Sequence, residues 1–426
     1  MQKAKSFTIS KHLLWQAWLK VKANQGSAGV DGQTIEDFEK DVENNLYKIW
    51  NRMCSGSYMP PPVKLVEIPK SGKGTRPLGI PTVADRVAQM AAVMILEPVL
   101  EPIFHPDSYG YRPGKSAHDA LEAARKRCWR YDWVLDVDIK AFFDSIDHAK
   151  LLTALERHTD CKWVKLYIRR WLVVPYQTSR GESIERTKGV PQGSVIGPLL
   201  ANLFLHYALD EWMRRNYAHI PFERYADDGI FHCQTLGQAQ MLEEAIRERL
   251  VACNLELNSE KTKIVYCKRS GRERNYSQVQ FDFLGFTFRP RLAKSTKTGY
   301  FVSFLPAISA KARKRIGETI RRWNLHLWTE KDLPFIARVI NPTLQGWLNY
   351  YGKFYKTAMY PLLKRLNQRL ARWLMQKFRK LRYHKRRAWH RLGKYASENP
   401  DLFAHWRFGV RPRKSFDESY QRIVTG

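Results

Sequence analysis

The sequence has few acidic residues for its number of basic ones. In 426 residues, 41 Asp and Glu stand against 72 Lys and Arg, which gives a formal net charge of +31. A chain with so little negative charge attracts polyanions and is repelled by other cationic surfaces. Nucleic acid is the leading polyanion, and a membrane surface is the competing one.

The sequence also lacks a run of about 18 apolar residues and lacks a signal segment at its N-terminus. We therefore expect a soluble intracellular protein and no membrane association. Its six cysteines include no Cys-x-x-Cys pair and have no histidine partner at zinc spacing, so we expect a reducing compartment and no structural zinc.

The hydrophobic pattern divides the chain into four parts. Residues 1–62 are mixed and end in three prolines, and residues 63–290 alternate strand-like and helix-like segments, as a mixed α/β unit does. Long helical patterns follow in residues 291–382, before a basic segment of residues 383–426. The predicted fold class is therefore α/β plus all-α. The first of the long helices is expected to bury a face formed by Ile316, Ile320, Trp323 and Leu327.

Two segments present carboxylates where strands are expected to end. Residues 133–139 have the alternating pattern of a strand, which puts Asp136 and Asp138 on one face. Asp227 and Asp228 lie in Tyr-Ala-Asp-Asp-Gly, which is typical of a hairpin tip. A lone Asp-Asp-Gly is more often a turn than a site. Carboxylates on adjacent strand ends repel each other unless a cation joins them, so we expect Asp138, Asp227 and Asp228 to bind two Mg²⁺ ions, with Mn²⁺ as a substitute.

The order of the motifs resembles that of bacterial group II intron reverse transcriptases, also called intron-encoded maturases, over nearly the whole chain. Tyr-Ala-Asp-Asp is the form common in that family, whereas viral RNA replicases usually carry Gly-Asp-Asp. The other matching blocks are residues 24–32, 68–81, 138–147, 189–194 and 283–286.

This resemblance implies a right-hand polymerase. Its fingers and palm would occupy residues 63–290, with an N-terminal extension of the fingers in residues 1–62 and a helical thumb or maturase domain in residues 291–382. The implied reaction is RNA-directed DNA synthesis, in which nucleotides are transferred from dNTPs to a primer 3′ hydroxyl. The catalytic residues would be Asp138, Asp227 and Asp228.

The resemblance also implies a nucleotide-binding set. Lys70 and Arg76, in a basic hairpin, would hold the phosphates of the incoming dNTP, the arginine with paired hydrogen bonds. Phe143 would stand where a ribose 2′ hydroxyl must go and so favour deoxynucleotides, although a buried core phenylalanine is the alternative interpretation. Gln192, in Pro-Gln-Gly, would offer amide donors to the nucleotide sugar or to the template.

Two segments of the later palm complete the polymerase. Lys261 is expected near the pyrophosphate, but Lys263 is close enough in sequence to leave that assignment open. Phe283, Leu284 and Gly285 read as an apolar β turn and resemble the primer grip, which positions the primer 3′ end.

The helical part is expected to bind nucleic acid through its basic faces. Residues 361–391 contain twelve Lys or Arg and no acid, whereas solvated helices usually mix both signs. Aromatic side chains in residues 342–355 either stack on unpaired bases or belong to the core. The candidate contacts to RNA, primer or template in this part are Lys311, Arg315, Arg322, Trp347, Lys353, Arg365, Arg369 and Arg372.

The expected partners are an intron RNA template, a DNA primer or target and dNTPs, in a ribonucleoprotein with group II intron RNA in the bacterial cytoplasm or nucleoid. Residues 383–426 either form a reduced DNA-binding segment or add RNA surface, and no endonuclease domain is expected. The sequence does not predict an oligomeric state.

Two alternative functions are a domesticated host reverse transcriptase in DNA repair or phage defence, and an RNA-binding splicing cofactor with little polymerase role. The splicing-cofactor alternative is disfavoured, because the polymerase residues Asp138, Gln192, Asp227 and Asp228 are intact.

Overall fold

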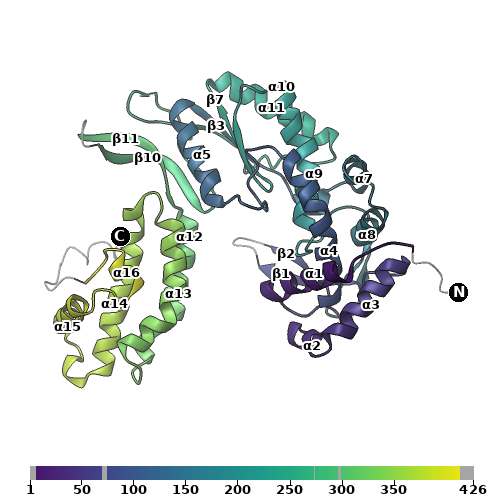
Figure 1. Cartoon of the computed structure of the whole chain (residues 1–426). Coiled ribbons are helices and arrows are strands. Elements are labelled where there is room, and N and C mark those ends of the chain that lie inside the picture. The colour runs from purple at the N-terminus through teal and green to yellow at the C-terminus, as the bar shows by residue number, and fades with distance from the viewer. Residues whose placement is uncertain (1–5, 70–73, 273, 296–298, 413–426) are drawn as a thin grey trace. The chain divides into compact units, whose positions relative to one another are not determined.

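The computed structural model describes residues 6–69, 74–272, 274–295 and 299–412 (Figure 1). The chain divides into two compact units, Met1–Ile264 and Val265–Gly426. The two units therefore separate before residue 290, where the sequence pattern placed the end of the palm.

The first part of unit 1 is a helical layer beside a small sheet. Ser10 caps α1 by accepting a hydrogen bond from the backbone N–H of His12, which satisfies a free amide of the first helical turn. The sheet has the order β2-β1-β4-β5, with β1 and β2 antiparallel as a hairpin. The elements are α1 (Lys11–Asn24), α2 (Ile35–Lys40), α3 (Val42–Ser55), β1 (Val63–Pro69), β2 (Thr75–Ile80), α4 (Val83–Leu100), β4 (Tyr176–Gln177) and β5 (Ser183–Ile184).

A second sheet, of order β6-β7-β3-β8, carries the candidate site. The predicted strand is confirmed as β3 (Trp133–Asp138), and the predicted hairpin as β6 (Phe222–Tyr225) and β7 (Asp228–Cys233), with β8 (Lys263–Tyr266) at the other edge. Contacts with the sheet come from α5 at β6 and β7, and from α11 at β3 and β7. The helices of this part are α5 (Ala117–Arg130), α6 (Phe142–Ser145), α7 (His148–Glu156), α8 (Lys162–Val173), α9 (Gly197–Leu205), α10 (Glu211–Asn216) and α11 (Leu236–Ala252), with a π-helical turn at His206–Asp210.

Unit 2 joins a three-stranded antiparallel sheet to a group of helices. The sheet order is β11-β10-β9, and Phe286, Phe288 and Phe304 are fully buried in it. Trp373 and Trp406 fill the helical core. The elements are β9 (Phe281–Phe283), β10 (Phe286–Ser295), β11 (Gly299–Ile308), α12 (Ala310–Arg322), α13 (Leu333–Tyr351), α14 (Tyr360–Lys377), α15 (Lys385–Glu398) and α16 (Ala404–Arg407).

The structure corrects the predicted apolar face of the first long helix. Ile316 and Ile320 are buried as expected, but α12 ends at Arg322. Asn324 has a φ of 46°, which is outside the helical range, so the chain turns away and Leu327 lies in a short 3₁₀ segment with 68% of its surface exposed. Residues 361–391 lie mainly in two separate helices, α14 and α15.

Across the described part of the chain, no helix combines the length and the apolar character that crossing a lipid bilayer would need.

Candidate active site

The Tyr-Ala-Asp-Asp motif forms the tip of the β6–β7 hairpin. Tyr225 pairs with Asp228, so Ala226 and Asp227 are the turn residues. Ala226 has a φ of 56°, a left-handed conformation that costs a residue with a side chain about 1–2 kcal/mol. Gly110 lies against this turn so closely that a Cβ there would be 2.5 Å from the Ala226 nitrogen. The surrounding structure therefore fixes the turn.

A buried arginine holds the turn from beneath. The guanidinium of Arg224, which is fully buried, donates to the Ala226 carbonyl at 3.0 Å and to Asn202 Oδ1 at 3.1 Å. It also donates two parallel hydrogen bonds to Asp210, at 2.7 and 2.6 Å, and one to Ser108 Oγ at 2.8 Å. Sequence reasoning missed this network, because its members come from four distant segments. The local signal was a pair of charged residues, Glu223 and Arg224, inside a four-residue strand.

The strand aspartate lies beside the hairpin. Asp138 is the last residue of β3 and stands opposite Asp228 in the register of β3 and β7. Lys261 Nζ contacts both oxygens of the Asp138 carboxylate at 3.0 Å, and Asn258 Nδ2 donates to one of them at 2.9 Å. Lys263 instead begins β8 and is exposed. Of the two lysines that the sequence left open, Lys261 is therefore the one at the carboxylates.

Burial and mutual repulsion disfavour the ionised form of these carboxylates. Burial raises the pKa of Asp228 to about 7, with further contributions from Asp227 and Asp138. Burial also raises the pKa of Asp227, and Asp138 adds to that shift, while Arg76 and Lys261 oppose it. Like charges that destabilise one another in this way are stabilised when a cation joins them.

A divalent ion fits the chemistry of this cluster, because carboxylate oxygens are the ligands that hard cations prefer. Among the described residues, however, no three His, Cys, Asp or Glu side chains stand ready together to hold a metal ion. Both oxygens of Asp138 are already engaged by Lys261. For such an ion, Asp227 and Asp228 would be the immediately available ligands, and Asp138 would first have to release Lys261.

The fingers hairpin reaches the Pro-Gln-Gly loop. Arg76 Nε donates to Gln192 Oε1, and Gln192 Nε2 donates to Asp144 Oδ2 at 3.2 Å. Gly193 has a φ of 111°, and a Cβ there would be 2.3 Å from the carbonyl oxygen of Gly79, so only glycine allows this approach. The structure thus brings Arg76 and Gln192 together. Lys70, which the sequence analysis assigned to the phosphates, lies outside the described residues.

Phe143 lies in the core below this loop. Its side chain has 7% of its surface exposed and makes an edge contact with Phe142, with ring centroids 5.4 Å apart. The Phe143 carbonyl accepts a hydrogen bond from the Val190 amide at 2.7 Å. The backbone of Phe143 therefore supports the Pro-Gln-Gly loop, and its role as a gate stays a prediction.

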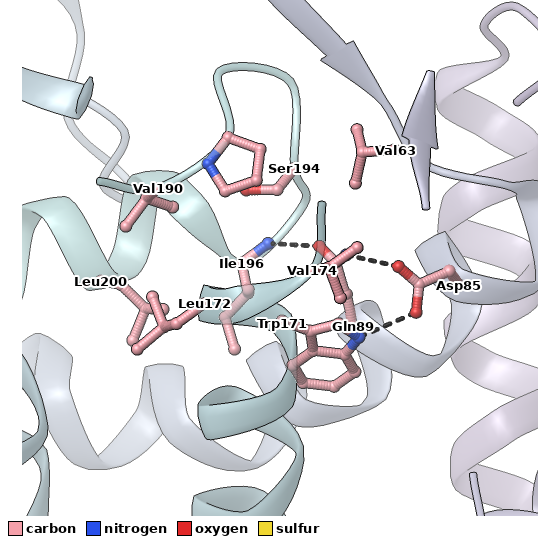
Figure 2. Close-up of a pocket in the computed structure, with 11 residues that line it drawn as sticks. Val63, Asp85, Gln89, Trp171, Leu172, Val174, Val190, Ser194, Ile196 and Leu200 are labelled. Carbon is pink, nitrogen blue, oxygen red and sulfur yellow. Dashed lines mark hydrogen bonds between the residues drawn. The ribbon is translucent and has the colours of Figure 1, made fainter. Parts of the chain in front are cut away.

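A series of buried, hydrogen-bonded polar side chains anchors the segment that follows the Pro-Gln-Gly loop (Figure 2). Gln89 Oε1 accepts hydrogen bonds from the backbone amides of residues 195 and 196, at 2.8 and 3.3 Å, and Gln89 Nε2 donates to Asp85 at 2.9 Å. The other Asp85 oxygen accepts from Tyr58 Oη and Trp171 Nε1, each at 2.8 Å. Burial raises the pKa of Asp85, and its three donors oppose that shift. Sequence reasoning did not single out these residues.

The segment that resembles a primer grip is a tight hairpin turn within unit 2. Leu284 and Gly285 have φ values of 50° and 80°, and both lie between β9 and β10, as in the turns that favour two-residue hairpins. The Leu284 carbonyl accepts a hydrogen bond from Tyr350 Oη at 2.9 Å. Phe283 and Tyr351 are buried beside this turn. The rings of Tyr350 and Tyr351 thus take part in the packing of unit 2.

The candidate nucleic-acid contacts of unit 2 differ in exposure. Trp347 is partly buried and stacks on Trp323, with ring centroids 5.6 Å apart and an interplanar angle of 20°. Arg369 is also partly buried. The exposed candidates are Lys311, Arg315, Arg322, Lys353, Arg365 and Arg372.

Comparison with known proteins finds similar sequences and a similar solved structure. The chain is 31% identical over 279 residues to protein YkfC of Escherichia coli strain K12, covering 55% of this chain and 71% of that protein. It is 33% identical over 204 residues to the group II intron-encoded protein LtrA of Lactococcus lactis subsp. cremoris, covering 47% of this chain and 33% of LtrA. A solved structure of telomerase from Candida albicans with a fragment of telomeric RNA aligns with a TM-score of 0.46 at 12% identity, over 88% of this chain and 67% of that one.

Two family models match the chain. The model for reverse transcriptase (RNA-dependent DNA polymerase) matches residues 68–288, which is just over half of the chain and includes all three candidate aspartates. The model for the maturase-specific domain of group II introns matches residues 313–392, which lie in the helical part of unit 2. Enzymes of the reverse transcriptase family generally use divalent metal ions. The chain therefore belongs to the reverse transcriptase family, and it carries a group II intron maturase-specific domain.

Proposed function

We propose that this reverse transcriptase extends a DNA primer on an RNA template by two-metal catalysis at Asp138, Asp227 and Asp228, and that it also binds a group II intron RNA and assists its splicing and mobility. The observation that carries the first part is the register of the sheet. It sets Asp138 opposite Asp228, with Asp227 at the adjoining turn, so that carboxylates from two strands meet.

The three carboxylates would hold two Mg²⁺ ions. These ions would make the primer 3′ hydroxyl more acidic and would neutralise charge on the leaving pyrophosphate. The chain's own part is to keep the ligands in place. Arg224 fixes the turn that carries Asp227, and the pairing of β3 with β7 fixes Asp138 against Asp228. Lys261, which now contacts Asp138, would be free to face the phosphates of the substrate when Asp138 serves as a ligand.

Selection of the nucleotide is assigned to the fingers hairpin and the Pro-Gln-Gly loop. Arg76 has guanidinium donors beyond the one that contacts Gln192, and they suit two oxygens of a triphosphate. Lys70 would add a point charge. Phe143, whose backbone is tied to the loop, would exclude a ribose 2′ hydroxyl and favour dNTPs.

Primer extension on an RNA template with dNTPs and Mg²⁺ tests the polymerase assignment. Asp227→Asn combined with Asp228→Asn should lower the rate by more than about 100-fold. Loss of a residue that only supports a metal ligand costs up to about 100-fold, and loss of the ligands themselves should cost more. The control is Asp160→Asn combined with Asp401→Asn, which removes the same charge from exposed positions. Normal synthesis by the first variant would refute the assignment.

The proposed role in splicing rests on the maturase-specific domain and on the basic face of α14. Arg365, Arg369 and Arg372 recur at spacings of four and three, so they lie on one side of that helix. LtrA, a relative, is named as a group II intron-encoded protein. Cations on one helix face are suited to bind the phosphates of an RNA backbone. Each such contact steepens the slope of log affinity against log salt concentration by about 0.7–0.9.

Splicing at low Mg²⁺ of an intron RNA cloned from DNA that flanks the gene tests this second role. The polymerase-deficient variant should still promote splicing, because RNA binding needs the basic surfaces and not the carboxylates. Arg365→Gln, Arg369→Gln and Arg372→Gln together should lower the salt slope of intron RNA binding by about 2. Splicing that stops in the folded aspartate variant would show that the two roles are not separable.

A further inference from the structure

A polar groove of unit 1 has no part in the roles described above. It has a volume of about 420 Å³, within the range of small-molecule sites, and it lies between α7 and the segment formed by the π-helical turn and α10. None of the three catalytic aspartates lines it, and neither do Arg76 and Gln192. We call it the palm groove and define it by Lys150, Arg157, Tyr207, Trp212, Arg215 and Arg249.

Basic side chains converge on the palm groove from three elements. Lys150 and Arg157 come from α7 and its C-terminal cap, Arg215 from α10 and Arg249 from α11, whereas Glu211 is the acid among the lining residues. Cations that converge in a concave site raise its positive potential and repel one another. The arrangement is therefore favourable when an anion enters.

Two of these cations are held by carbonyl oxygens. Lys150 Nζ donates to the Ala252 carbonyl at 2.6 Å, and Arg249 donates to the carbonyls of residues 207 and 208 at 2.9 Å each. A carbonyl orients a cation without cancelling its charge. Both side chains are thus positioned in advance while keeping their full charge, which lowers the entropy cost of binding an anion.

The charge of Glu211 is largely satisfied by a residue that does not line the palm groove. Arg214 binds both oxygens of Glu211, at 2.8 and 3.0 Å, and Arg215 approaches at 3.4 Å. The hydrogen bond from Arg214 is the largest cause of the lowered pKa of Glu211. Glu211 therefore engages mainly Arg214 and leaves the positive charge of the groove mostly uncompensated.

Flat aromatic surfaces accompany the charge. The Arg157 guanidinium lies 5.4 Å from the centroid of the Tyr207 ring, and the Tyr207 hydroxyl is hydrogen-bonded to His158 Nε2 at 2.6 Å. Trp212 is partly buried and packs against Tyr217, with ring centroids 5.1 Å apart. The Tyr207 and Trp212 rings are thus held in fixed positions on the same segment as Arg215.

We propose that the palm groove binds a nucleoside phosphate, either free or as an unpaired nucleotide of a strand. Arg157 and Arg215 would grip the phosphate oxygens with their planar donor sets, and Tyr207 and Trp212 would stack against the base. A peptide of acidic residues alone would satisfy the cations, but it has no aromatic ring to stack on Tyr207 and Trp212. The volume and the pairing of charge with aromatic surface favour the nucleotide.

Photolabelling of the full chain with 8-azidoadenosine 5′-monophosphate tests the proposal. The reaction is run without divalent ions, so that binding at the catalytic carboxylates contributes little, and the labelled peptides are mapped by mass spectrometry. The expected result is label within residues 206–216. Label confined to other parts of the chain would overturn the proposal.

Charge variants show whether labelling depends on the groove or on the overall charge. Arg157→Glu with Arg215→Glu should reduce labelling at residues 206–216 about tenfold or more, and the neutral pair Arg157→Gln with Arg215→Gln should give a smaller loss. The matched control is Lys20→Glu with Arg130→Glu, which changes the net charge equally at exposed positions outside the groove. Circular dichroism checks folding. Equal losses in the groove and control variants would overturn the proposal.

Competitors identify the source of the nucleotide. If AMP and a ten-residue oligoadenylate compete equally per nucleotide, the ligand is a single free nucleotide, whereas an oligomer that competes about tenfold better per nucleotide indicates a strand with several phosphate contacts. A glutamate decapeptide that competes as well as the oligomer would refute a nucleotide site. Asp227→Asn with Asp228→Asn should label like the wild type, so this proposal and the polymerase assignment fail independently.

Discussion

At the scale of single residues, Arg224 connects the stability of the palm to its chemistry. It is buried, it pairs with Asp210, and it donates to the carbonyl of Ala226, whose left-handed conformation needs support. A buried ion pair contributes little net stability, but removal of one partner leaves an uncompensated charge. The main value of Arg224 therefore lies in fixing the turn that carries Asp227.

Arg224→Gln should lower the free energy of unfolding by about 3–5 kcal/mol, because the Asp210 carboxylate would stay buried without its partner. Urea unfolding followed by circular dichroism measures this change. The double variant Arg224→Gln with Asp210→Asn should recover much of the stability but little primer extension, because the hydrogen bond to Ala226 is still lost. Full activity of a stable double variant would contradict the positioning role.

His405 should make unit 2 sensitive to acid. Its imidazole is fully buried, Nε2 is hydrogen-bonded to Asn367 Oδ1 at 2.7 Å, and Nδ1 has no hydrogen-bond partner among the described residues. Burial lowers the pKa of His405 from its ordinary value of 6.5 to about 3. Below pH 6.5 the unfolded chain therefore takes up a proton that the folded chain excludes, and stability falls as the pH falls.

The expected loss for this histidine approaches about 1.4 kcal/mol for each pH unit below 6.5. Denaturant unfolding at pH 7 and pH 5 measures it. His405→Gln should show a smaller difference between the two pH values, whatever its stability at pH 7. The same pH dependence in the variant would assign the effect to other groups.

At the scale of elements, local patterns predicted most of what the site needs. The strand that ends at Asp138, the Tyr-Ala-Asp-Asp hairpin and the Leu284–Gly285 turn follow from alternation and turn chemistry within a few residues. The end of α12 did not follow, because the hydrophobic spacing continues to Leu327 past the point where Asn324 turns the chain. The contacts of Arg224 with Ser108, Asn202 and Asp210, and those of Gln89 with residues 195 and 196, could not be predicted either, because these partners are far away in the sequence.

The turn between β9 and β10 should be sensitive to a methyl group. Gly285 has a φ of 80°, and a Cβ there would lie 3.2 Å from Tyr351 Oη. Gly285→Ala should therefore destabilise the protein by about 1–2 kcal/mol, measured by thermal or urea unfolding. If the turn also positions the primer, extension should weaken mainly through a higher KM for primer.

A glycine in a helix of the same unit provides the control. Gly346 lies within α13, and a Cβ there would have no neighbour within 4 Å. Gly346→Ala should stabilise the protein by about 0.5–1 kcal/mol, because alanine restricts the unfolded chain and suits a helix. A stabilised Gly285→Ala variant would mean that the turn adopts another conformation in solution.

At the scale of the whole molecule, the fold should not depend on metal. Lys261 and Asn258 already satisfy Asp138, and the raised pKa of Asp228 allows that carboxyl group to carry a proton near neutral pH. EDTA should therefore abolish primer extension but shift the melting temperature by less than about 1 °C, the effect of less than about 1 kcal/mol in a chain of this size. Differential scanning calorimetry with and without EDTA checks this. A large drop in melting temperature would show that a structural metal supports the fold.

The contact between Lys261 and Asp138 has one more consequence, for the order of events in each catalytic cycle. The lysine side chain is 65% exposed, so the contact is weak and breaks easily. We predict that this exposed lysine is a placeholder on Asp138, which a dNTP arriving with its own cation would displace. In the free enzyme Lys261 would then stay on Asp138, and the substrate itself would assemble the complete catalytic centre. Coupling of this kind would keep the carboxylates from acting on a primer end before the correct nucleotide is in place.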